Sequence, residues 1–158
     1  MNDLNTIGLD AVRSGELARQ LNDLLSNYSI FYQNTRGYHW NIKGDDFFVL
    51  HQKFEDLYNN LFLKIDEVAE RILTLGFRPN HNFSEYFKTS SILEADGVID
   101  GQDSVSRVLE SLGILLAKQR TILDLSAEID DTGTNSLMSD YIREQEKMMW
   151  MYSAYIKN

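Results

Sequence analysis

The chain contains no cysteine. This excludes disulfide bonds and thiolate ligands, so any metal site must use nitrogen and oxygen donors. Nor does the chain have an apolar run of about 18 residues, the length that a membrane-spanning helix needs. Residues 1–20 also lack the apolar segment of a secretory signal. These absences predict a cytoplasmic protein.

Positive charge is scarce as well, and the formal net charge is −9 at pH 7. An acidic surface repels the phosphate backbone of nucleic acids and favours the attraction of cations. Lysine and arginine form no basic arm, because Arg13 is the first basic residue of the chain and the last few residues offer only Lys157. DNA binding is therefore disfavoured.

Four long stretches of the sequence repeat apolar residues at helical spacing, and no alternating strand pattern competes with them. The chain has 158 residues, of which 43% are hydrophobic, enough for one domain with a real core. We predict an all-α fold, a four-helix bundle in a single domain over residues 1–158. The expected helices are Leu9–Gly37, Asp45–Leu75, Gln102–Ile129 and Thr134–Ile156.

The connection from Gly76 to Gly101 is long for a compact domain, where helix–helix links usually take about 2–8 residues. Such a segment can travel the length of a bundle, which would make the second and third long helices parallel. That arrangement resembles the single crossover of ferritin-like folds. Because the segment holds Phe83, Tyr86 and Phe87, we expect part of it to pack as a short extra helix.

The most informative residues are two histidines and three carboxylates. Within the second expected helix, His51 mirrors Glu70 and Glu55 mirrors Asp66 about the midpoint between residues 60 and 61. All four side chains fall on one face, but Glu55 and Asp66 lie about 16 Å apart along the axis, too far to share a metal ion. A second copy of the helix, antiparallel across a two-fold axis, would bring the two halves together. His39, near the end of the first helix, would complete each site.

This ligand set suits iron, manganese or zinc better than calcium. An intrachain di-iron bundle would need Glu-x-x-His pairs, and no glutamate stands three residues before any histidine here. Each residue also has an ordinary interpretation: a histidine at a helix end can simply cap or pack, and carboxylates at i, i+4 can simply face solvent. Their joint mirror arrangement favours the shared metal site.

Four short segments resemble the Dps family of mini-ferritins, named as DNA-binding proteins from starved cells. They are HWNIKG at 39–44, FFVLH at 47–51, FEDLY at 54–58 and DEVAER at 66–71. The resemblance extends over the whole chain. It implies a ferritin-like four-helix subunit in a hollow homododecamer, which binds iron at two-fold interfaces.

The resemblance implies a ferroxidase that oxidises Fe(II) with hydrogen peroxide or O₂ and stores the ferric mineral, protecting the cell against oxidative stress. The implied catalytic residues are His39 and His51 of one subunit with Asp66 and Glu70 of its neighbour. Glu55 stands as a further metal ligand, and zinc or manganese would compete with iron.

The family also suggests other features and an alternative function. A tryptophan matching Trp40 lies beside the site in the family, and acidic residues line the openings through which ions pass. Candidates for those openings are Glu128, Asp130, Asp131 and Asp140. The alternative function is a cage that binds and compacts DNA with little ferroxidase activity.

Overall fold

The computed structural model describes residues 3–157, which are almost entirely helical. The helices are α1 (Ala11–Asn41), α2 (Phe47–Thr74), α3 (Phe83–Thr89), α4 (Gly101–Glu128) and α5 (Thr132–Tyr155). An isolated bridge joins Leu4 to Asp10, and the described residues contain no named strand. The all-α prediction is confirmed, and the four long helices lie within a few residues of their predicted bounds.

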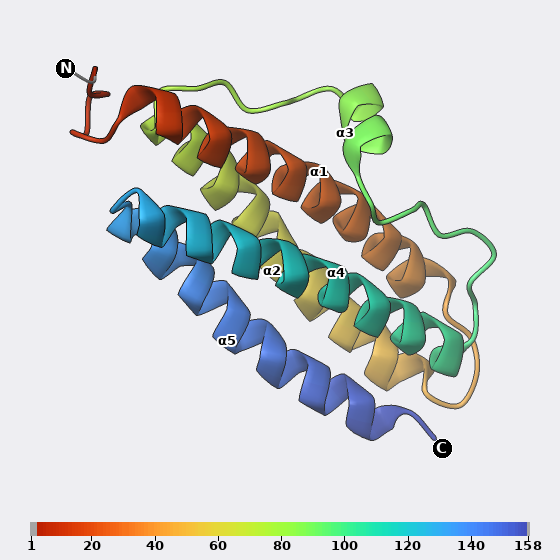
Figure 1. The fold of residues 1–158 in the computed structure, drawn as a ribbon. Coiled ribbons are helices and arrows are strands. Elements are labelled where there is room, and N and C mark those ends of the chain that lie inside the picture. Colours follow the sequence, from red (N-terminus) through yellow and green to blue (C-terminus); the bar gives the residue numbers. More distant parts are fainter. Residues whose placement is uncertain (1–2, 158) are drawn as a thin grey trace.

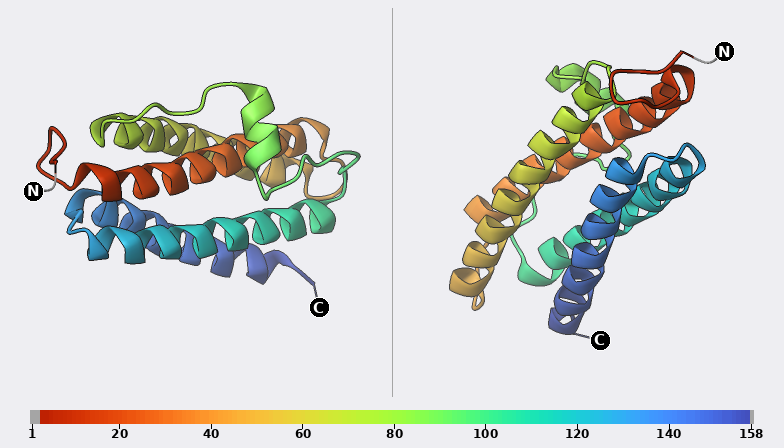
Figure 2. Two further views of the ribbon diagram at one scale, coloured as in Figure 1. Left: turned by 45° about the horizontal axis from the view of Figure 1, so that its top comes forward. Right: turned by 90° about the vertical axis from the view of Figure 1, so that its left-hand side faces the viewer.

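Two antiparallel helix hairpins make up the bundle (Figure 1). One pairs α1 with α2, the other pairs α4 with α5, and α1 also contacts α4. The crossover carries the chain back along the length of the bundle, so α2 and α4 run in the same direction (Figures 1 and 2). The single-crossover topology predicted from the length of this segment is therefore confirmed.

Apolar side chains from all four long helices fill the core. Its centre also holds a closed ring of polar contacts between Tyr28, Gln119 and Gln145, which are all buried. The Tyr28 hydroxyl donates to Gln119, Gln145 donates to the same hydroxyl over 2.6 Å, and Gln119 donates to Gln145 over 2.7 Å. Neutral groups that satisfy one another thus occupy this part of the bundle interior.

Asparagines of α1 hold the crossover in place. The buried Asn27 carboxamide oxygen accepts hydrogen bonds from the backbone N–H groups of Ser91 (3.0 Å) and Ile92 (3.1 Å). Two helical turns further along α1, Asn34 donates to the carbonyl of Leu93 and accepts from the N–H of Ala95. These side chains supply the partners that an irregular backbone segment otherwise takes from water.

The expected short helix exists as α3, and it packs against α1 through Tyr86, which is half-buried against the core. None of its residues is buried, and Phe83 and Phe87 are 88% and 62% exposed. Beyond the helix, Ile92 and Val98 are buried in the core. Phe83 and Phe87 therefore form an outward apolar surface on α3.

The turns follow from glycines with positive φ. Gly44 (φ 114°) precedes α2 and Gly76 (φ 94°) follows it, a conformation that costs glycine little. Asp46 stands at the N-cap of α2 but makes no side-chain capping bond, and its carboxylate instead accepts from the Tyr155 hydroxyl over 2.6 Å. No helix among the described residues is long and apolar enough to cross a membrane.

Candidate metal centre

The two histidines of the predicted site lie together within one subunit. His39, in the last turn of α1, and His51, in the first turns of α2, stack with ring centroids 3.8 Å apart and planes 13° from parallel. Each ring makes the same contact with the other residue's backbone: Nδ1 of His39 lies 2.6 Å from the His51 carbonyl oxygen, and Nδ1 of His51 lies 2.7 Å from the His39 carbonyl oxygen. The two residues thus fix each other.

This exchange determines the tautomer of both rings. A carbonyl oxygen only accepts hydrogen bonds, so each Nδ1 carries a proton and donates it. In a neutral imidazole, Nε2 then holds the free lone pair. Metal-binding histidines are commonly oriented by a hydrogen bond to a backbone carbonyl from the ring nitrogen that does not bind the metal. Both rings are therefore prepared to bind a metal ion through Nε2.

Glu55 lies one helical turn after His51, on the same side of α2. Its carboxylate accepts from Gln52 over 3.3 Å, and Gln52 also donates to Asp56 over 2.9 Å. The Tyr58 ring closes this region at 5.3 Å from the His39 ring, in an edge-on arrangement. Glu55 thus lies on the side of α2 that carries His51, but it does not form a group of three ligands with the two histidines.

The second half of the site lies near the other end of α2. Asp66 and Glu70 are exposed there, one turn apart, and their carboxyl groups are close enough to share a hydrogen bond. That hydrogen bond and the negative charge of Asp66 raise the pKa of Glu70 above its ordinary value of 4.5. The two carboxylates thus form the acidic half of the candidate site.

Within one subunit, the structure brings His39 and His51 together and leaves Asp66 and Glu70 at a distance. Among residues 3–157, no group of three or more His, Asp or Glu side chains converges to hold a metal ion. The bundle interior offers the neutral ring of Tyr28, Gln119 and Gln145 in place of carboxylates. The ligands predicted from the sequence therefore form two incomplete halves, both on α2 and the adjoining end of α1.

A groove of 770 Å³ lies beside this surface, between α1, α2 and the crossover. The Arg36 guanidinium crosses it, 4.8 Å above the Trp40 ring and 5.4 Å above the Tyr32 ring. Its exposed apolar lining comes from Trp40 of α1, from Phe62 of α2 and from Phe83 and Phe87 of α3. Because Phe62 belongs to α2, the groove is continuous with the face that carries the predicted ligands.

The prediction that Asp131 lines an ion opening is wrong. Asp131 is 2% exposed, and its carboxylate binds the Arg71 guanidinium over 2.6 Å. The residue takes part in an internal ion pair because it caps α5, where it accepts from the N–H of Thr134. Glu128, Asp130 and Asp140 are exposed.

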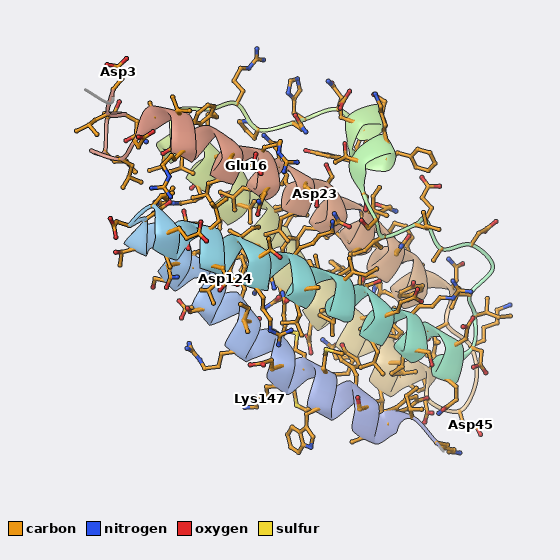
Figure 3. The ribbon with its side chains drawn as sticks, in the orientation of Figure 1. Asp3, Glu16, Asp23, Asp45, Asp124 and Lys147 are labelled. Atoms are coloured by element: carbon orange, nitrogen blue, oxygen red, sulfur yellow. The ribbon has the colours of Figure 1, made fainter. Side chains whose placement is uncertain are left out.

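Charged side chains are dispersed over the subunit (Figure 3). The acidic residues labelled there lie in the amino-terminal segment (Asp3), on α1 (Glu16 and Asp23), in the α1–α2 turn (Asp45) and on α4 (Asp124). Some are paired, as Glu16 is with Arg19, which helps to lower the pKa of Glu16 to about 2. The negative charge is therefore spread over several elements.

Comparison with known proteins identifies the class. The family model described as a ferritin-like domain matches residues 18–158. A DNA protection during starvation protein of Porphyromonas gingivalis is 41% identical over 152 residues, covering 96% of each chain. A crystal structure of the Dps protein from Vibrio cholerae O1, described as a ferritin-like diiron-carboxylate protein, matches with a TM-score of 0.96. That match has 56% identity and covers 98% of this chain and 97% of the other. A Dps protein from Bacillus brevis matches with a TM-score of 0.89, at 31% identity over 92% and 98% of the two chains.

The fold and the comparisons define a ferritin-like protein. Within that class, this chain belongs to the Dps family.

Proposed function

We propose that the protein oxidises ferrous iron at sites shared between two copies of the chain and stores the ferric product inside a homododecameric cage. Each site would take His39, His51 and Glu55 from one subunit and Asp66 and Glu70 from its neighbour. The observation that carries this proposal is the separation of two complementary half-sites along one helix, at mirrored positions.

The surface around the half-sites supports association of two copies through α2. Exposed apolar residues stand at mirrored positions, since Phe48 mirrors Leu73 about the same midpoint that relates the ligands. Phe48 is 83% exposed and Leu73 is 56% exposed, and Phe62 and Leu63 lie exposed near the midpoint. Such apolar area on a monomer indicates a contact surface, and a two-fold axis makes each patch complementary to itself.

Charge supports the choice of substrate. Two imidazoles prepared to bind through Nε2 and several carboxylates suit a divalent transition metal, and the carboxylates offset the charge that a ferrous ion gains on oxidation. Hydrogen peroxide accepts two electrons, one from each of two ferrous ions. With two protons, its O–O bond breaks to give two water molecules, so no hydroxyl radical is released. Protection against oxidative stress would follow from removing both reactants.

The relatives that are named for DNA protection leave open a second function, a cage that compacts DNA. This chain has a net charge of −9, and the first basic residue, Arg13, lies within α1. Because phosphate contacts supply most non-specific affinity, an acidic chain without a basic arm is poorly suited to that role. Iron oxidation is the function that the residues support better.

The test of the proposal removes one half-site. Replacing Asp66 and Glu70 by alanine together alters exposed side chains and should leave the cage intact, as measured by size-exclusion chromatography with light scattering. The rate of Fe(II) oxidation after anaerobic loading should fall sharply relative to the unmodified chain. Unchanged oxidation kinetics in an intact cage would show that the site lies elsewhere.

A further inference from the structure

Arg71, the residue that follows Glu70, makes two polar contacts that join α2 to the start of α5. Arg71 donates through Nε to the Thr134 hydroxyl over 2.8 Å and through a terminal nitrogen to Asp131 over 2.6 Å. Its partners are almost completely buried, at 0% exposure for Thr134 and 2% for Asp131. They also bind each other, because the Thr134 hydroxyl donates to the second carboxylate oxygen of Asp131 over 2.5 Å.

The space around this guanidinium is closed. A Cβ atom added at Gly133 would lie 2.8 Å from both terminal nitrogens of Arg71, closer than non-bonded atoms approach. The first turn of α5 therefore needs glycine at this position so that the guanidinium can lie against it. The contact joins the last turns of α2 to the start of α5, elements about 60 residues apart in the sequence.

We propose that Arg71 is a positioning residue for the acidic half-site, an inference that rests on the proposed function. Apolar packing holds this end of α2 through Val68, Ile72 and Leu75, but such contacts have little directionality. The planar guanidinium of Arg71 instead donates two hydrogen bonds in defined directions, which fixes the rotation of α2 about its own axis. Glu70 precedes Arg71 directly and Asp66 lies one turn before Glu70, so their positions opposite a partner's histidines depend on the same rotation.

The stringency of metal ligation makes this rotation matter. Ligand bonds of about 2.0–2.2 Å leave little room for displacement, and contacts outside the ligand shell commonly change metal affinity about 10–100-fold. Asp66 and Glu70 are exposed, and the hydrogen bond that they share joins two residues of the same helix, so it does not orient that helix against its neighbours. The directional contact of Arg71, on a different face of the helix, supplies that constraint.

The sharpest test displaces the guanidinium while keeping every charged residue. Gly133→Ala places a methyl group where the end of the flexible Arg71 side chain lies, and alanine is the better helix former. Gly113→Ala is the matched control, because it lies within α4 and an added Cβ there meets nothing within 4 Å. A second pair, Arg71→Lys and Arg71→Met, keeps or removes the charge without the planar guanidinium.

The readout is binding of Co²⁺ to the intact cage, followed by its visible absorption spectrum without oxidant. We expect Gly133→Ala to weaken Co²⁺ binding about tenfold and to change the spectrum, with Gly113→Ala matching the unmodified chain. Arg71→Met should lose more affinity than Arg71→Lys. An assembled Gly133→Ala cage with unchanged Co²⁺ affinity and spectrum would overturn the positioning role. If Gly133→Ala fails to assemble, the same result in Arg71→Met would overturn it. Absence of Co²⁺ binding by the unmodified cage would instead overturn the proposed function itself.

Discussion

Mixing two inactive variants tests directly whether the site is shared. One variant carries His51→Ala and lacks part of the histidine half-site. The other carries Asp66→Ala with Glu70→Ala and lacks the acidic half-site. If both halves of a site came from one subunit, no combination of these copies would contain an intact site.

The expected recovery follows from two-fold symmetry. In a contact between unlike copies, one of its two sites combines both damaged halves and the other combines both intact halves. Random pairing of equal amounts makes half of the contacts unlike, so about 25% of all sites regain a complete ligand set. A site contained within one subunit would give no recovery.

Co-expression of the two variants with different affinity tags, followed by sequential purification, yields mixed cages. The assay is the initial rate of Fe(II) oxidation per subunit after anaerobic loading, compared with each variant alone and with the unmodified chain. Mass spectrometry of cross-linked dimers gives the fraction of unlike contacts, which corrects for biased pairing. Mixed cages no more active than either variant alone would refute the shared site.

Two further predictions concern stability. The hydrogen bond with Asp66, together with the negative charge of Asp66, raises the pKa of Glu70 and favours its protonated form in the folded protein. Metal-free stability should therefore decline as the pH rises from 4.5 through that raised pKa, and Asp66→Asn should flatten this dependence in thermal melts. Asn27→Ala should leave the backbone N–H of Ser91 without its side-chain acceptor and the N–H of Ile92 with Ser90 Oγ alone, at a total cost of about 1–3 kcal/mol. A lower melting temperature than that of Gln33→Ala, an exposed α1 control, would confirm the clamp, and equal melting temperatures would contradict it.

The arrangement of the helices could be predicted because it depends on local signals. Apolar spacing marks each long helix, glycines mark the turns, and the length of the segment from Gly76 to Gly101 fixes the parallel pairing of α2 and α4. The outward orientation of Phe83 and Phe87 could not be predicted. Apolar residues indicate that a contact forms, but they do not indicate whether the same subunit or another molecule makes it. Asp131 was wrong as an ion-opening residue for a similar reason: sequence alone does not show which acid faces an arginine sixty positions earlier.

The site residues were found by a symmetry of spacing, whereas their preparation for metal binding is a property of the three-dimensional contacts. No sequence pattern indicates that His39 and His51 exchange backbone carbonyl contacts, since their partners lie twelve residues apart across a turn. That exchange determines which ring nitrogen is free. The mirror spacing identifies the candidates, and the carbonyl contacts show why they can act as ligands.

The two half-sites differ in what stabilises them, and this difference bears on assembly. The histidine half is satisfied within its own subunit through stacking and two hydrogen bonds. The acidic half consists of exposed carboxylates whose mutual repulsion is unrelieved except by a shared proton. A divalent ion that bridges the halves replaces repulsion with attraction and adds bonds across the two-fold contact. Metal loading should therefore strengthen association between the two copies as well as position iron for oxidation.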